Sequence, residues 1–113
     1  MIIVDTNAVI DIKNLRKKLE EFANFGDVVI LDNSIKELER MKNKKARLAL
    51  SLIKHYNIKI LETNTNCPAD EAIIKLATQK DAVVTNDKKL IKRLKAKGVN
   101  IIRLRQEKYL TLE

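Results

Sequence analysis

Residues 82–94 read AVVTNDKKLIKRL, which is a short apolar run, a polar turn and a segment with helical spacing. Residues 82–84 are long enough for a strand and too short for a helix, and unbroken apolarity is typical of a strand buried on both faces. Leu90, Ile91 and Leu94 then recur at the spacing of one helix face. The stretch therefore predicts a buried strand that leads through a short turn into an amphipathic helix.

The same pattern recurs along the rest of the chain. Similar apolar, β-branched runs occupy residues 2–4, 28–31, 58–61 and 99–104. Segments with helical periodicity separate these runs, and strands that alternate with helices build right-handed βαβ units with helices on both faces of a parallel sheet. We therefore expect an α/β protein: a three-layer α/β/α sandwich with a central, mainly parallel five-stranded sheet, formed by residues 1–113 as a single domain.

Composition sets limits on the class of protein. The chain has 113 residues, of which 45% are hydrophobic, and this is enough for one core without a disulfide or a structural metal. Lysine and arginine number 23 against 15 acidic residues, and the net charge of +8 favours a polyanionic partner such as nucleic acid. A lysine-rich surface equally reflects solubility or adaptation to heat, so charge alone does not settle the function.

Several sites and locations are excluded by what the sequence lacks. One cysteine and one histidine are too few for an internal disulfide or a Cys/His metal site. No signal peptide or membrane-spanning run is present, so we expect a cytoplasmic protein with no membrane partner. Two phenylalanines and two tyrosines are too few for an extensive base-stacking platform.

Four acidic residues are predicted to meet at one edge of the sheet. Asp5 and Asp87 follow the first and fourth predicted strands, and therefore lie at strand carboxyl ends. Glu37 is placed on a helix that Asn33 or Ser34 opens after the second strand, and Asp70 in the first turn of a helix that begins near residue 68. Both helices start at the same edge, so all four carboxylates are expected to face one crevice.

Each acid also has an ordinary structural interpretation. Asp5 and Asp87 are potential N-caps, Asp70 is a first-turn acid that the helix dipole favours, and Glu37 is compatible with a solvated helix face. Together, however, four converging carboxylates repel one another unless a cation neutralises them. Mg²⁺ prefers oxygen ligands and binds through few carboxylates, so such a cluster can hold a divalent ion that activates water for attack on a phosphodiester.

Four sequence motifs carry a family resemblance. They are VDTN at 4–7, IKELE at 35–39, ADEAI at 69–73 and VTNDKKL at 84–90. In this order and approximate spacing, the chain resembles PIN-domain ribonucleases over essentially its whole length. The resemblance implies a nuclease that uses Mg²⁺ or Mn²⁺ to cleave single-stranded RNA endonucleolytically. It also implies a homodimer, and either an antitoxin partner or a role in RNA processing or decay.

The resemblance also assigns residues to the site. It implies Asp5, Glu37, Asp70 and Asp87 as catalytic metal ligands, with polar support from Asn7 and Thr85. Within the same motifs, Glu39 is the alternative assignment to Glu37, and Glu71 is the alternative to Asp70. Asp81 is a further candidate, at the outer side of the acidic cluster. As a working hypothesis, Asp5 binds the main metal, Asp87 and Asp70 complete its shell directly or through water, and Glu37 orients or deprotonates the attacking water.

Basic residues flank two of these acids. Lys36 and Arg40 lie beside Glu37, and Lys88 and Lys89 follow Asp87, so these four are candidates for sequence-independent phosphate contacts. For any one of them, a solvated surface residue is the alternative interpretation.

Other functions remain as alternatives. A Rossmann or P-loop enzyme is disfavoured because no glycine-rich phosphate loop is present. An aspartate-based phosphatase or receiver-like domain shares the early acid, but Asp5 is followed by Thr6 and Asn7 without a second acid. A non-catalytic RNA-binding or assembly module with the same fold would use the acids as caps and the basic face for binding.

Two further features of the sequence each have two interpretations. Leu48, Leu52 and Tyr56 form a second apolar stripe on one helix, which predicts either a neighbouring helix or a homodimer contact. Residues 105–113 are compatible with a docking segment or with a final strand extension.

Overall fold

A single mixed sheet organises the protein, and the computed structural model describes residues 1–11, 15–105 and 109–112 of it. The strand order is β3-β2-β1-β4-β5-β6, in which β1 to β5 are parallel and β6 runs antiparallel to β5. The five-stranded parallel sheet is thus confirmed, and the tail extends it by a sixth strand. The strands are β1 (Ile2–Val4), β2 (Val28–Leu31), β3 (Lys59–Leu61), β4 (Ala82–Val84), β5 (Asn100–Arg105) and β6 (Tyr109–Leu112).

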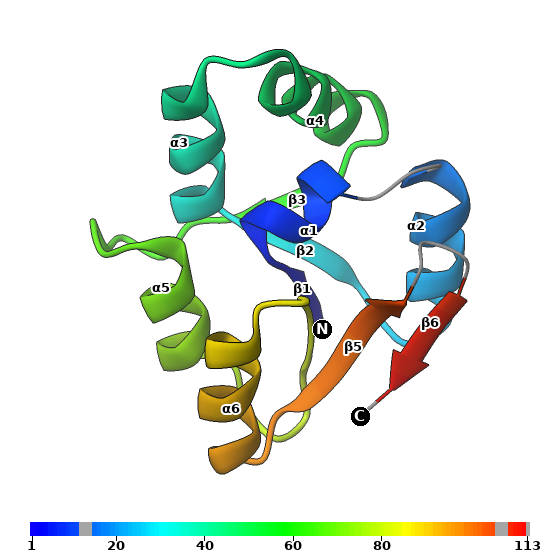
Figure 1. Ribbon diagram of the computed structural model, residues 1–113, viewed down its shortest axis with the longest axis vertical. Helices are drawn as coiled ribbons and strands as arrows, with labels where there is room; N and C mark the ends of the chain where they lie inside the picture. The colour runs from blue at the N-terminus through cyan, green and yellow to red at the C-terminus, as the bar shows by residue number, and fades with distance from the viewer. Residues whose placement is uncertain (12–14, 106–108, 113) are drawn as a thin grey trace.

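Helices cover both faces of this sheet, as the three-layer expectation requires (Figure 1). Side chains of α1, α2, α3 and α4 join one core cluster, whereas those of α5 and α6 join the other. The helices are α1 (Thr6–Asp11), α2 (Leu15–Ala23), α3 (Asp32–Met41), α4 (Lys44–His55), α5 (Ala69–Leu76) and α6 (Lys88–Ala96).

Strand pleating explains why the apolar runs are continuous. Ile2 and Val4 of β1 belong to the cluster under α1 to α4, whereas Ile3 between them belongs to the cluster under α5 and α6. Successive strand side chains point to opposite faces, so a strand covered on both sides needs every residue to be apolar. Ile3 is fully buried, and its burial stabilises the fold by about 2 kcal/mol.

Strand register fixes the edge at which the loops emerge. Val4 pairs with Val84, and both are the last residues of their three-residue strands. The next residues, Asp5 and Thr85, therefore leave the sheet side by side at its carboxyl edge, where open α/β sheets place their functional crevice.

The second apolar stripe, on α4, packs only partly against the rest of this chain. Leu52 and Tyr56 are partly buried against the core, whereas Leu48 is 60% exposed. Packing within this chain therefore accounts for most of the stripe, and a homodimer stays a prediction. Among the described residues, no helix combines the length and the apolarity needed to cross a membrane.

Candidate active site at the carboxyl edge of the sheet

Asp5 is the buried acid of the site. Its backbone N–H donates to the carbonyl of Val84 at 3.0 Å, which joins the end of β1 to the end of β4. Its side chain is only 7% exposed, and its Oδ2 accepts a 2.9 Å hydrogen bond from the hydroxyl of Thr85. The fold thus holds a carboxylate in one orientation at the point that the topology marks for function.

Thr85 connects this acid to Asp87. The hydroxyl oxygen of Thr85 accepts a 3.1 Å hydrogen bond from the backbone N–H of Asp87, and Thr85 itself is fully buried. Asp87 is the N-cap of α6, with its Oδ1 accepting from the N–H groups of Lys89 at 2.9 Å and Leu90 at 3.3 Å. The capping interpretation of Asp87 is therefore confirmed. Both capping bonds end on Oδ1, so the second carboxylate oxygen of Asp87 takes no part in capping.

Asp5 and Asp87 open onto one cavity of about 350 Å³. Asn7, Ala8 and Asn86 complete its lining, so the predicted polar support Asn7 lies beside both acids. Two carboxylates and two amides within one cavity form a set of oxygen donors that suits a hard cation.

Electrostatics at this edge also favour a positive ligand. Burial raises the pKa of Asp5 above its ordinary value, and the negative charges of Asp87 and Glu37 raise it further. Hydrogen bonds from Thr85 and Thr6 oppose this shift without cancelling it. A carboxylate that is buried beside two other acids is stabilised by a nearby cation, which lowers the cost of keeping it ionised.

Glu37 lies beside this cavity and is tied to two other segments. The hydroxyl of Thr6 donates to its Oε1 at 3.2 Å, and the backbone N–H of Ala69 donates to its Oε2 at 2.8 Å. Thr6 is 2% exposed and directly follows Asp5, so this bond ties Glu37 to the buried acid. The role of Thr6 was missed from the sequence, although VDTN contains it.

Asp70 is the most peripheral of the four predicted acids. It is exposed in the first turn of α5, where its Oδ1 accepts a 2.9 Å bond from the N–H of Glu71. It follows Ala69, whose N–H binds Glu37, and so stands next to the site without lining the Asp5 cavity. Glu71 and Asp70 differ in their contacts, because Glu71 forms a two-point ion pair with Arg93 at 2.6 and 3.2 Å.

Two further acids stand apart from the site. Glu39 is exposed on α3 and lines neither the Asp5 cavity nor the one beside Glu37. Asp81 precedes β4 at the amino edge of the sheet, and its carboxylate accepts bonds from Thr78 and from the terminal ammonium of Met1. Placing Asp81 as an outer member of the cluster is therefore wrong, because strand direction puts it at the opposite edge.

A complete set of metal ligands is not assembled by these acids alone. Within the described residues, no group of three or more Asp, Glu, His or Cys side chains lies close enough together to hold an ion. Asp5 and Asp87 nevertheless share a cavity, and Mg²⁺ is commonly bound through one or two carboxylates, with water and substrate phosphate as the other ligands. The donor set therefore fits a hydrated divalent ion better than a fully protein-ligated one.

Comparison with known proteins places this geometry in a family. A family model described as a PIN like domain matches residues 2–107. The chain belongs to the PIN-domain family. Ribonuclease VapC4 of Methanocaldococcus jannaschii is 37% identical in an alignment 94 residues long, and the match covers 74% of this chain and 70% of that protein.

Solved structures agree with the fold of this PIN domain. The PIN domain endonuclease Utp24 matches with a TM-score of 0.81 at 24% identity, over 99% of this chain and 90% of that one. A domain of a functionally unknown protein from Methanocaldococcus jannaschii matches with a TM-score of 0.62 at 22% identity, over 92% and 90% of the two chains. At these identities, the two matches support the fold alone.

A polar network fixes the loop that leads into α5 of this PIN domain. The side-chain amide of Asn33, 3% exposed, donates to the carbonyls of Thr65 at 3.1 Å and Cys67 at 2.8 Å, and its Oδ1 accepts from the hydroxyl of Thr63 at 2.7 Å. Asp32 accepts from the N–H and the hydroxyl of Thr63. The prediction that Asn33 or Ser34 opens this helix is wrong, because α3 begins at Asp32. The sequence does not reveal the actual role of Asn33, since its partners lie 30 or more residues away.

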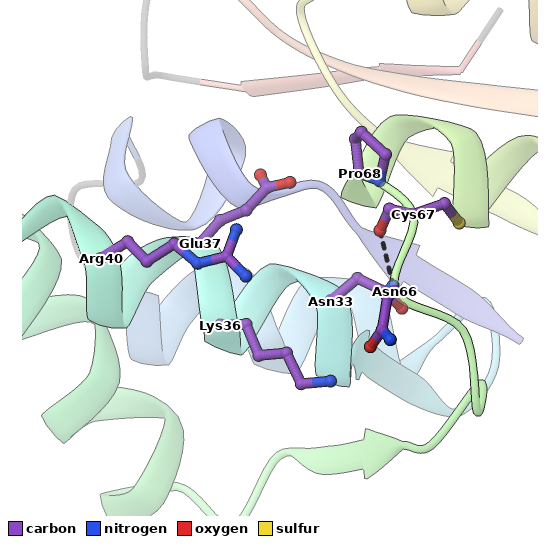
Figure 2. Close-up of a pocket in the computed structure, with 7 residues that line it drawn as sticks. All are labelled: Asn33, Lys36, Glu37, Arg40, Asn66, Cys67 and Pro68. Carbon is purple, nitrogen blue, oxygen red and sulfur yellow. Dashed lines mark hydrogen bonds between the residues drawn. The ribbon is translucent and has the colours of Figure 1, made fainter.

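The predicted phosphate-contacting residues lie on two helices of the PIN domain. Lys36 and Arg40 are exposed on α3 and line a second cavity, of about 270 Å³, beside Glu37 (Figure 2). Lys88 and Lys89 are exposed in the first turn of α6, directly after Asp87. Positive side chains thus stand on both sides of the acids.

Proposed function

We propose that this PIN domain is a metal-dependent endoribonuclease that hydrolyses phosphodiester bonds in single-stranded RNA. The observation that carries the proposal is the shared cavity of Asp5 and Asp87 at the carboxyl edge of the sheet, with the Asp5 carboxylate buried and oriented by Thr85. The similarity to ribonuclease VapC4 supports the same class of reaction, and the fold is shared with the PIN domain endonuclease Utp24.

In this proposal Asp5 and Asp87 hold Mg²⁺ or Mn²⁺, and Asp70 and Glu37 complete the site directly or through water. When bound, such an ion lowers the pKa of a coordinated water and stabilises charge on the scissile phosphate. Glu37 orients or deprotonates the attacking water, for which its half-buried carboxylate between Thr6 and α5 is suitably fixed. Asn7 and Thr85 hold the acids in position.

Substrate binding in the proposal depends on charge. Lys36, Arg40, Lys88 and Lys89 contact phosphates, because the chain carries a net charge of +8 and these four residues flank the acids. Single-stranded RNA suits such contacts, since its backbone can follow a cleft beside the sheet edge without strand separation.

The cellular setting belongs to the proposal as well. We expect a cytoplasmic homodimer that works with an antitoxin or an RNA-processing partner. The homodimer and the partners rest on the family resemblance, and the location on the sequence features given above. Among the described residues, the large hydrophobic side chains that are exposed and suit a protein contact are Phe25, Met41, Leu48 and Ile60.

A non-catalytic RNA-binding module is the second candidate, and one observation favours it. Asp87 caps α6 and Glu37 binds the N–H of Ala69, so both acids also have structural roles. Asp5 also has structural contacts, but burial beside two other negative charges raises its pKa and makes its ionised form costly, which favours a bound cation over a purely structural role. An aspartate-based phosphatase remains the weaker alternative, since exposed Asn7 stands where a second acid is needed.

The deciding experiment compares cleavage of labelled single-stranded RNA by the wild type and an Asp5→Asn/Asp87→Asn variant in Mg²⁺, Mn²⁺ or EDTA. We expect metal-dependent cleavage that the variant loses. An Asp27→Asn/Glu39→Gln variant removes two exposed carboxylates outside both cavities and serves as the control, with cleavage close to wild type. Folded wild type that binds RNA without cutting it in any metal would favour the binding module, and hydrolysis of a chromogenic phosphate ester without RNA cleavage would favour the phosphatase.

A further inference from the structure

One face of α3 forms a wall of the 270 Å³ cavity beside Glu37. Asn33, Lys36, Glu37 and Arg40 line it, at the i, i+3, i+4 and i+7 positions of a single helix face. Their spacing means that the cavity runs along about two turns of the helix and not across a chance gap between side chains.

The opposite wall is the turn formed by residues 66–68. Figure 2 shows this turn facing the α3 side chains, with the Asn33 amide bonded to the carbonyl of Cys67 at 2.8 Å. A second bond from Asn33, to the carbonyl of Thr65 at 3.1 Å, holds the approach to the turn. Because buried side-chain bonds fix the loop, the cavity is preorganised and needs little ordering when a ligand binds.

Charge in the cavity is predominantly positive. In the described part of the chain neither Lys36 nor Arg40 forms a salt bridge, although the charge of Lys36 helps to lower the pKa of Asp32, one turn earlier on α3. The carboxylate of Glu37 accepts one bond at each oxygen, from Thr6 and from the N–H of Ala69, and these bonds orient it toward α1 and α5. Two cations and the amide of Asn66 remain as groups for an anionic ligand.

We propose that this cavity binds one phosphodiester group of the RNA strand, next to the phosphodiester that is cut at the Asp5 and Asp87 cavity. This inference rests on the proposed function and adds a second subsite to it. Glu37 and Thr6 connect the two cavities, since Thr6 follows Asp5 and binds Glu37. Lys36 and Arg40 neutralise the negative charge of this phosphodiester, and the side-chain amide of Asn66 donates to its phosphate oxygens.

A phosphate fits the lining better than a base does. None of the described residues that line the cavity is aromatic, so a nucleobase finds no stacking partner among them. A guanidinium and an ammonium on adjacent helical turns, in contrast, supply the charge-assisted hydrogen bonds that phosphate oxygens accept.

The test measures RNA binding in EDTA, where metal-dependent cleavage is absent. Fluorescence anisotropy of a labelled single-stranded oligonucleotide is followed with wild type, Lys36→Gln/Arg40→Gln and the control Lys59→Gln/Lys80→Gln. Lys59 and Lys80 are exposed, lie at or near the amino ends of β3 and β4, and match the loss of two charges at the opposite edge. We expect the cavity variant to bind about ten-fold more weakly than the control, with a salt slope smaller by about 0.7 for one lost phosphate contact.

The outcomes separate this subsite from the nuclease proposal. Equal affinity and salt slope in the cavity and control variants would overturn the subsite while cleavage by the wild type stands. Weaker RNA binding and a smaller salt slope in the cavity variant, in a protein that never cuts RNA, would leave the subsite standing and overturn the proposed reaction.

Discussion

The hydroxyl of Thr85 bonds to both acids that share the main cavity. It donates to Oδ2 of Asp5 at 2.9 Å and accepts from the backbone N–H of Asp87 at 3.1 Å. Thr85 and Asp5 are 80 positions apart in the chain, and the pairing of β1 with β4 brings them together. One fully buried hydroxyl therefore links the carboxylate of Asp5 to the backbone of Asp87.

Replacing Thr85 tests this coupling. Thr85→Val keeps the shape and removes the hydroxyl, so Asp5 loses its donor and the N–H of Asp87 loses its acceptor. We expect RNA cleavage to fall by about 10- to 100-fold, the usual range when a group that orients a metal ligand is removed. Thr85→Ser restores both bonds and is expected to recover most activity in single-turnover assays. Wild-type cleavage by a folded Thr85→Val variant would show that this hydroxyl is dispensable.

Removing the charge of Asp5 is expected to stabilise the metal-free protein. Because the pKa of Asp5 is raised in the folded state, its ionised form costs folding free energy at pH values above that raised pKa. Below its ordinary unfolded pKa the group is neutral in both states and costs nothing. Asp5→Asn should therefore melt at a higher temperature than the wild type in EDTA at pH 7, and the difference should vanish as the pH falls toward 3.

Added Mg²⁺ supplies the internal control for this effect. The ion is expected to raise the melting temperature of the wild type and to leave that of Asp5→Asn nearly unchanged, because only the wild type keeps the ligand. A variant that melts below the wild type in EDTA at pH 7 would contradict the assignment of Asp5 as a destabilising, cation-requiring acid.

Most of the fold was predictable because local sequence and tertiary environment agree. Three-residue runs such as residues 2–4 and 82–84 are apolar throughout, and only strands covered on both faces require that pattern. The order of strands and helices then places Asp5 and Asp87 at the carboxyl edge. The sixth strand is one of two alternatives that the sequence allows for residues 105–113, because a mixed polar and apolar tail carries no signal for pairing with β5.

Contacts of the site were less predictable, since they depend on side chains that meet only after folding. The bond from Thr6 to Glu37 spans 31 positions, and the bond from Asn33 to Cys67 spans 34. Motif spacing names the acids but does not reveal which of them are bonded to backbone groups. The prediction that Asp81 belongs to the acidic cluster fails for a different reason. An acid that precedes a parallel strand lies at the amino edge of the sheet, whereas the site lies at the carboxyl edge.

We expect the contribution of Asp81 to the free energy of unfolding to depend on pH. Burial alone would raise its pKa, but hydrogen bonds from Thr78 and from the terminal ammonium outweigh this and lower the pKa below its ordinary value. A lowered folded pKa adds stability above the unfolded pKa, and this is lost as the pH falls through the folded value. Asp81→Asn should reduce the free energy of unfolding at pH 7 by about 1–3 kcal/mol. Urea titrations should show the gap closing in acid, and a gap independent of pH would contradict the argument.

The loop that Asn33 holds is expected to matter for catalysis beyond its contribution to stability. Asn33→Ala removes the donors for the carbonyls of Thr65 and Cys67, which frees the turn before Ala69 and thereby the N–H that binds Glu37. We expect a loss of about 2 kcal/mol in stability, as for a buried polar group left without a partner, and a fall in cleavage of about ten-fold or more.

A variant that loses a helix cap elsewhere separates the effect of Asn33 on catalysis from its effect on stability. Asn43 caps α4 by accepting from the N–H of Ala46 at 2.8 Å, and Asn43→Ala should cost about 1 kcal/mol without touching the 63–68 loop. Both variants are assayed at a temperature where each is fully folded, and kcat is measured separately from KM. Because Glu37 is assigned to the attacking water, Asn33→Ala should lower kcat while Asn43→Ala does not. Equal kcat values in the two variants would show that Asn33 has only a structural role.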